Sequence, residues 1–182
     1  MEADIDRIVV PRKRIAERVR ELGAQIARTY EKDAAEGLTL VAILSGSVIF
    51  LADLIRCLPL RMKIGLITVS SYPGTATHSR GATVRQELKV DVSGRHVLIV
   101  DDILDTGGTL RRVQQRLGES RPKSLRTCVL LRKPGKAPPD VFADFVGFDI
   151  EDVFVVGYGL DYNDHYRNFP DIGVLRKELC GP

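Results

Sequence analysis

The sequence predicts an α/β fold in which helices flank a mostly parallel central sheet. Short apolar runs alternate with segments whose apolar residues recur every three or four positions, as buried strands and amphipathic helices do. Strands without polar alternation are typical of parallel sheets that are covered on both faces. With 182 residues, 44% of them hydrophobic and 28% charged, the chain has the length and composition of one domain spanning 1–182.

The first elements are a long helix, a strand and a second helix. An amphipathic helix begins at Pro11, and we expect Gly37 to end it. Its apolar residues follow at steps of four and three: Ile15, Val19, Leu22 and Ile26. The apolar run Leu38–Leu44 then forms a strand, Ser45-Gly46-Ser47 breaks it, and Val48–Leu58 is helical again.

The rest of the chain continues this alternation. Met62–Ser71 is rich in β-branched residues and predicts a strand, whereas the small, polar stretch Ser71–Val84 predicts a mobile loop. The further elements are the strand Val97–Val100, the helix Leu110–Leu117 ending near Gly118, and the strands Leu125–Leu131 and Val153–Val156.

The ends of these strands are the places to look for a binding site. In parallel sheets, ligands bind beyond the carboxyl ends of the strands, where the strand order reverses. Polar residues or glycines stand at four such ends: Ser45-Gly46-Ser47, Ser71-Tyr72, Asp101-Asp102 and Gly157–Asp161.

One motif, VLIVDDILDTGGTL at 97–110, joins a buried strand, an acid pair, a glycine turn and a helix. Asp101 and Asp102 follow the strand directly. Because adjacent carboxylates repel each other, we expect a cation or a hydroxyl-rich ligand to compensate them. Such a ligand is a ribose, held directly or through Mg²⁺.

The turn after the acid pair predicts a phosphate-binding loop. Gly107 and Gly108 allow close backbone approach, N–H groups at the helix start attract anions, and Thr106 and Thr109 add hydroxyl donors. The alternative is that the acids cap the helix and the glycines only make a turn. No GxxxxGK[ST] motif occurs, which argues against an ATPase.

Charge and cysteine usage narrow the function classes. The formal net charge is only +3, from 27 basic and 24 acidic residues, so no nucleic-acid partner is indicated. Three cysteines without CxxC spacing fit a reducing cytoplasm, and three histidines show no HExxH spacing. No apolar stretch approaches the ~18 residues of a membrane span, and the N-terminus has no apolar leader. We therefore expect a cytoplasmic protein without a membrane partner.

The 97–110 motif resembles the phosphoribosyl-pyrophosphate (PRPP) signature of the type I phosphoribosyltransferases, in which two acids precede a D-[TS]-G-x-T loop. ITVSSY at 67–72, FVGF at 145–148 and FVVGYGLDYNDHYR at 154–167 are similar to the bacterial hypoxanthine(-guanine) phosphoribosyltransferases. The resemblance implies a core of about 38–160, a hood from the terminal segments, and a lid of about 71–84 that includes Ser71 and Tyr72. It also implies purine salvage, with Mg²⁺ as cofactor and PRPP and a 6-oxopurine as substrates.

The resemblance implies a role for each residue of the motif. Asp101 and Asp102 would hold the ribose hydroxyls and one Mg²⁺, and Asp161 would approach a second Mg²⁺. The 5′-phosphate loop would consist of Asp105, Thr106, Gly107, Gly108 and Thr109. Asp105 would also be the general acid/base near N7 of the purine, so its surroundings should raise its pKa or act through hydrogen bonding.

Further roles follow from the same resemblance. Lys133 would donate to the purine O6, Phe154 would stack on the ring, and Val155 and Asp161 would lie at its edge. Read without the family, Lys133 is a surface cation, and Phe154 and Val155 are strand core. Pyrophosphate would be bound by Ser45, Gly46 and Arg167, with a cis peptide bond between Leu44 and Ser45.

Three positions depart from the family pattern. Asp101 stands where glutamate is usual, Ser45 where lysine or arginine is common, and Gly108 where a longer residue often occurs. The sequence leaves open whether hypoxanthine, guanine or xanthine is preferred, and whether a homodimer or a homotetramer forms. A nucleic-acid-binding regulator with this fold is the alternative class, and it would need a basic face or an added segment.

Overall fold

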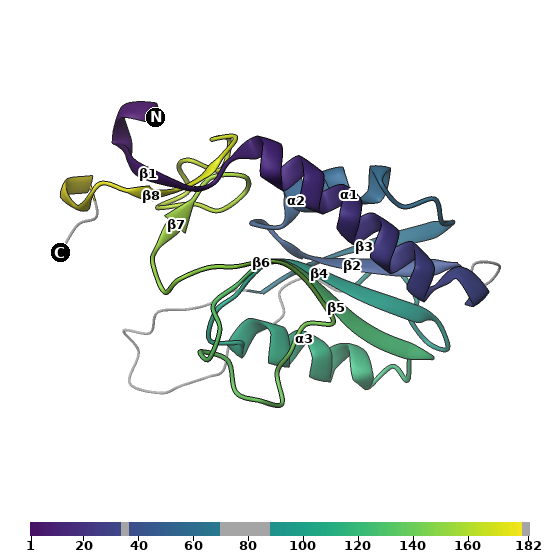
Figure 1. Ribbon diagram of the computed structural model, residues 1–182. Helices are drawn as coiled ribbons and strands as arrows, with labels where there is room; N and C mark the ends of the chain where they lie inside the picture. Colours follow the sequence, from purple (N-terminus) through teal and green to yellow (C-terminus); the bar gives the residue numbers. More distant parts are fainter. Residues whose placement is uncertain (34–36, 70–87, 180–182) are drawn as a thin grey trace, which may run out of the picture.

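A five-stranded parallel sheet forms the centre of the molecule (Figure 1), with the strand order β3-β2-β4-β5-β6. The computed structural model describes residues 1–33, 37–69 and 88–179. The strands of this sheet are β2 (Leu38–Leu44), β3 (Met62–Thr68), β4 (His96–Leu104), β5 (Ser124–Arg132) and β6 (Phe145–Asp149). Every neighbouring pair is parallel, which confirms the predicted fold class.

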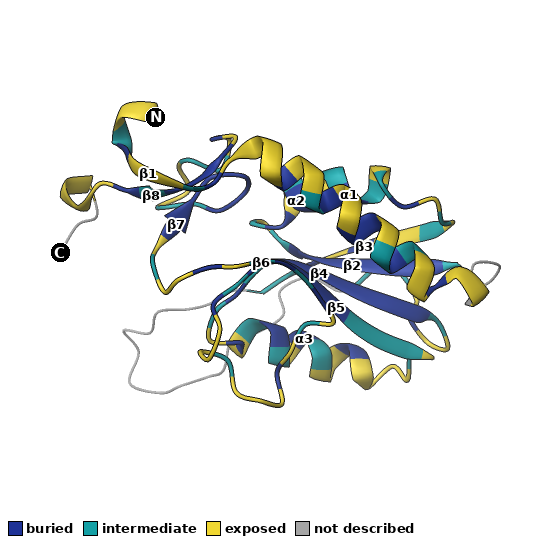
Figure 2. Cartoon of the chain, in the orientation of Figure 1, coloured by how far each residue is buried: buried dark blue, intermediate teal, exposed yellow. Residues whose placement is uncertain are grey.

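Helices cover both faces of this sheet. α1 (Arg12–Thr29) and α2 (Val48–Arg56) lie on one face, and α3 (Gly108–Gly118) lies on the other (Figure 1). The central strands are therefore buried on both sides (Figure 2), which accounts for their apolar sequences. Among the described residues, no helix has the length and apolar character that crossing a membrane requires.

The first helix is shorter than predicted. It ends at Thr29 and not near Gly37, and a short 3-10 turn follows it. Tyr30, at the end of the helix, is only 2% exposed, and its ring meets the ring of His96 edge-on. This aromatic ring thus packs against the start of β4 directly after the helix ends.

A second, three-stranded sheet lies at the end of the molecule where both termini are found (Figure 1). β1 (Ile5–Val10) and β7 (Val155–Val156) each pair with β8 (Ile172–Leu175) in antiparallel fashion. The sequence patterns do not predict β1, β6 or β8, since these short runs become strands through pairing with distant segments. The predicted strand Val153–Val156 shrinks to β7, because only its last two residues pair with β8.

β4 is longer than predicted, and this corrects the placement of the acid pair. Asp101 and Asp102 lie within the strand and not after it, since pairing with β5 continues through Asp101↔Val129 to Leu104↔Arg132. Pairing with β2 stops at Ala42↔Val100. The acid pair therefore lies where β4 has lost one neighbour and kept the other.

The strand order reverses between β2 and β4. From β2 the chain passes through α2 to β3, whereas β4 lies on the other side of β2 and leads through α3 to β5. Two neighbouring strands thus send their chains to opposite sides, which leaves room for a ligand beyond their carboxyl ends.

Candidate active site

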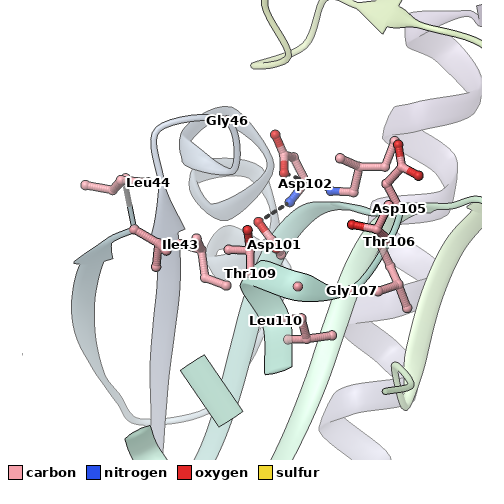
Figure 3. A pocket seen from close by; sticks show the side chains of 14 residues that line it. Ile43, Leu44, Gly46, Asp101, Asp102, Asp105, Thr106, Gly107, Thr109 and Leu110 are labelled. Atoms are coloured by element: carbon pink, nitrogen blue, oxygen red, sulfur yellow. Dashed lines mark hydrogen bonds between the residues drawn. The ribbon is translucent and has the colours of Figure 1, made fainter. Parts of the chain in front are cut away.

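The turn between β4 and α3 lines a cavity of about 260 Å³ (Figure 3). Gly107 has a left-handed φ of 77°, and the helix begins at the next residue. A Cβ atom at Gly107 would lie 2.9 Å from the side chain of Val141, so both conformation and space favour glycine. Thr106 and Thr109 line the same cavity. The N–H groups and dipole of the first turn of α3 suit this end of the cavity to a phosphate group.

The acid pair adjoins this turn. Asp101 is 6% exposed and accepts a hydrogen bond from the Asp102 backbone N–H at 3.0 Å. Burial raises the pKa of Asp101 well above its ordinary value, and the charge of Asp102 adds to the rise. Burial also raises the pKa of Asp102. Lys133 and Arg167 form ion pairs with other carboxylates, and the charge of Arg167 offsets only part of the rise at Asp102. A bound cation would therefore stabilise the acid pair.

The turn between β2 and α2 is in contact with Asp102. A Cβ atom at Gly46 would lie only 1.7 Å from Asp102 Oδ2, so no side chain can be accommodated there. Ser45 next to it is exposed, and the peptide bond between Leu44 and Ser45 is cis, which confirms that expectation. The sequence had no signal for this contact, because Gly46 lies in the turn after β2 and Asp102 lies in β4.

The acid pair is also the candidate metal site. The described part of the chain gathers no group of three or more His, Cys, Asp or Glu side chains around one point. Asp161, the third predicted ligand, pairs instead with Arg167 at 2.8 Å. Mg²⁺ prefers oxygen ligands and is commonly held by one or two carboxylates together with substrate phosphates. Asp101 and Asp102 fit an ion whose coordination is completed by a phosphate-bearing substrate.

A second cavity, of about 230 Å³, shares Asp102 and Asp105 with the first. Lys133 lines it and is only 7% exposed, so it is not a surface cation. Phe154 also lines it and is 52% exposed, with its ring 5.8 Å from that of Tyr162. The cavity therefore combines a buried ammonium group with an open aromatic face.

Asp105 lies between two lysines. Lys133 Nζ is 3.0 Å from its Oδ2, and Lys136 Nζ is 3.0 Å from its Oδ1. Burial acts to raise the pKa of Asp105, but the hydrogen bonds and charges of the two lysines outweigh it and lower the pKa. The expectation of a raised pKa is therefore wrong, and hydrogen bonding is the alternative that remains.

Sequence reasoning missed two members of this group. Asp105, Lys133, Lys136 and Asp152, here called the charge cluster, are joined by four ion pairs. The only available signal was the spacing of Lys133 and Lys136, which one turn of chain brings together. Asp152 carries no signal in the sequence, because it joins them from the segment between β6 and β7.

Arg167 links the far side of the site. Its Nη1 donates to the backbone oxygen of Gly159 at 2.9 Å and lies 2.8 Å from Asp161 Oδ1. A Cβ atom at Gly159, where φ is +106°, would lie 2.0 Å from the backbone oxygen of Gly46. The turn at 157–160 therefore packs directly on the turn that contains Gly46.

Two further residues missed by sequence reasoning hold this turn. The Tyr158 hydroxyl donates to Asp53 Oδ2 on α2 at 2.6 Å. Tyr158 is 8% exposed, and its φ is +49°. The positive φ and the buried hydroxyl bond fix the turn against α2.

Apart from Ser45, which lines neither cavity, the predicted site residues within the described ranges come together here. They come from the turn after β2, from β4 and α3, from the end of β5 and from the segment 154–167. Val155 also lines the second cavity, and Gly108 begins α3. The predicted lid residues Ser71 and Tyr72, and the whole loop 71–84, lie outside the described residues.

Comparison with known proteins agrees with this arrangement. Residues 9–163 match the family model of the phosphoribosyl transferase domain. The chain is 43% identical over 168 residues to a hypoxanthine phosphoribosyltransferase of Salmonella typhimurium, covering 92% of this chain and 94% of that one. It is 39% identical over 179 residues to a hypoxanthine-guanine phosphoribosyltransferase of Streptococcus pneumoniae, covering 98% of each chain.

A solved structure is similar over the full length. The crystal structure of a hypoxanthine phosphoribosyltransferase from Staphylococcus aureus aligns with a TM-score of 0.92 and 37% identity, covering 100% of this chain and 97% of that one. The family match spans most of the chain and includes the β4–α3 motif. The chain therefore belongs to the phosphoribosyltransferase family.

Proposed function

We infer that the protein is a purine-salvage transferase that moves the phosphoribosyl group of PRPP to N9 of hypoxanthine or guanine and releases pyrophosphate. The observation that carries this conclusion is one continuous site, in which a phosphate-binding turn and the buried acid pair adjoin a cavity with a buried lysine and an aromatic face. Relatives named for hypoxanthine or for both purines support the substrate class.

The PRPP side is served by the first cavity. The start of α3, with Asp105, Thr106, Gly107, Gly108 and Thr109, binds the 5′-phosphate through backbone N–H groups and hydroxyls. Asp101 and Asp102 accept hydrogen bonds from the ribose hydroxyls. These two carboxylates would hold Mg²⁺, which when bound supplies positive charge against the departing pyrophosphate.

The purine side is served by the second cavity. Lys133 donates to O6, Phe154 stacks on the ring, and Val155 presents its backbone to the ring edge. Asp105 is ionised at neutral pH, since the lysines lower its pKa, and it accepts the N7 proton or a hydrogen bond from N7. Placing the purine between these groups orients N9 toward the ribose carbon.

The pyrophosphate binds beside the two turns that pack on each other. Ser45 and Gly46 offer backbone N–H groups, and Arg167 offers a guanidinium fork that suits phosphate oxygens. Asp161 fixes that guanidinium in the free protein and would approach a second Mg²⁺. Charge building on the leaving group is stabilised by donors that are already in place.

We propose one domain over 1–182, with a core of about 38–160 and a hood formed by the N- and C-terminal segments, which carry β1 and β8. Ser71 and Tyr72 belong to a lid that excludes water from the reacting ribose. The protein works in the cytoplasm as a homodimer or homotetramer.

A spectrophotometric assay with PRPP, Mg²⁺ and one purine at a time tests the function. Hypoxanthine or guanine should give the nucleoside monophosphate together with pyrophosphate. The same assay with xanthine measures how strictly the enzyme selects its purine base. Absence of product with hypoxanthine and guanine would overturn the proposal.

A further inference from the structure

The charge cluster is a closed arrangement of two lysines and two carboxylates. Lys133 Nζ lies 3.0 Å from Asp105 Oδ2 and 3.1 Å from Asp152 Oδ1. Lys136 Nζ lies 3.0 Å from Asp105 Oδ1 and 2.7 Å from the same Asp152 oxygen. Each lysine therefore contacts both carboxylates, and the four charges cancel.

The four residues reach this point from three separate segments. Asp105 follows β4, the lysines follow β5, and Asp152 lies between β6 and β7. The side chain of Lys133 is 8% exposed, whereas those of Lys136 and Asp152 are 32% and 60% exposed. Lys133 thus lines the second cavity, whereas Lys136 and Asp152 do not line it and are more exposed to solvent.

We propose that Lys136 and Asp152 are positioning residues that orient the two purine-facing groups, Asp105 and Lys133. This inference rests on the proposed function. An ammonium group has three donors, so pairing with Asp105 and Asp152 leaves Lys133 one donor for O6. Lys136 Nζ lies 3.0 Å from Oδ1 of Asp105, and the carboxylate keeps a lone pair for N7.

The electrostatics of the cluster are consistent with this assignment. Hydrogen bonds and charges from the lysines lower the pKa of Asp105 against the effect of its burial. The same lysines lower the pKa of Asp152, Lys136 more than Lys133. Asp102 and Asp161 line the same cavity and add negative charge, so a second cation beside Asp105 offsets their field.

Substitution of Lys136 tests the proposal. Lys136→Met should raise KM for hypoxanthine about fivefold, an effect at the upper end for an ion pair that is partly exposed. KM for PRPP should stay within about twofold, because Lys136 touches only the purine side. Lys136→Arg should restore the parent KM. Lys13→Met, an exposed lysine on α1, is the matched control and should behave as the parent.

A double-mutant cycle tests whether Lys136 and Asp152 act together. Asp152→Asn removes the charge and keeps the shape, and its effect on KM for hypoxanthine should resemble that of Lys136→Met. The double variant should be little worse than either single one, since residues in one network are not additive. Full additivity would contradict joint positioning.

The outcomes separate this inference from the function itself. A parent enzyme that does not use hypoxanthine or guanine overturns the function. A parent enzyme that uses them while Lys136→Met and Lys136→Gln leave KM for hypoxanthine unchanged overturns only the role of Lys136. Equal changes in KM for PRPP and for hypoxanthine, without rescue by Lys136→Arg, would also overturn it, because they indicate a general structural effect.

Discussion

The acid pair and the charge cluster lie on the same edge of the sheet, but the pKa values of their aspartates shift in opposite directions. Asp101 and Asp102 are desolvated side by side, and burial raises the pKa of both. Asp105, three residues further on, is held by two lysines that lower its pKa. In one half of the site burial disfavours the charged carboxylates, whereas in the other half the two lysines stabilise them.

This difference indicates that the protein itself neutralises the charges on the purine side, whereas the PRPP side needs cations that bind with the substrate. A purine is uncharged, so its side of the site can be balanced and oriented in advance. PRPP is a polyanion that arrives with divalent cations, so two adjacent buried carboxylates become useful when those cations bind. The acid pair should therefore depend on the metal, and the charge cluster should depend on its own residues.

Metal removal should produce the largest effect. Excess chelator should lower turnover by at least ~10³-fold, since several kcal/mol of charge stabilisation are lost. The initial rate is measured before and after dialysis against chelator and again after adding Mg²⁺. Full turnover in excess chelator would show that the acid pair does not depend on a metal ion.

Asp105→Asn, a substitution in the charge cluster, should have the next largest effect on turnover. The amide cannot take the N7 proton, so kcat should fall by about 10²-fold or more while KM changes little. Steady-state kinetics with hypoxanthine measure both constants, and Glu21→Gln on α1 is a surface control. A kcat within about threefold of the parent, worth only ~0.65 kcal/mol, would show that Asp105 has no such role.

Base selection tests Lys133. The ammonium group can only donate, so a 6-amino group leaves a buried donor unpaired, and adenine should be used at least ~10²-fold less well than hypoxanthine in kcat/KM. Lys133→Ala should lower kcat/KM for hypoxanthine by about 10-fold, the cost of a lost hydrogen bond to a charged group, and narrow the gap to adenine. Lys133→Gln should be milder toward adenine, because its amide can accept. If the parent used adenine as well as hypoxanthine, the role of Lys133 would be refuted.

The smallest expected effect is a change in thermal stability when the charge of Asp101 in the acid pair is removed. The pKa of Asp101 is higher in the folded protein than in the unfolded chain, where it is about 4. The free energy of unfolding therefore falls as pH rises from about 4 through the higher folded pKa. Without metal, Asp101→Asn should therefore raise Tm near pH 7.5 by about 2–4 °C, the shift that ~1 kcal/mol gives in a domain of this size.

The pH dependence checks the sign of that stability effect. The gain should disappear near pH 4, where Asp101 is protonated in the folded protein, and melting curves in chelator at both pH values measure it. A gain of the same size at both pH values would show that charge is not the cause.

The sequence predicted the parts of the fold that depend on neighbouring residues. The apolar runs Leu38–Leu44 and Val97–Val100 indicated buried strands, and both lie in the central sheet. The order of acids, glycines and helix in 97–110 indicated the phosphate turn, because these residues form it locally. The family resemblance added roles for Lys133 and Phe154 that their own surroundings in the sequence did not suggest.

Only the tertiary structure decided the contacts between segments. The length of β4 depends on its pairing with β5, and Tyr30 after α1 packs against His96 of a distant strand. The sequence of a strand records that it is buried but not which strands flank it. For that reason the strand order decides that Lys136 pairs with Asp152 and that Gly46 approaches Asp102. It also decides that the pKa of Asp105 is lowered and not raised.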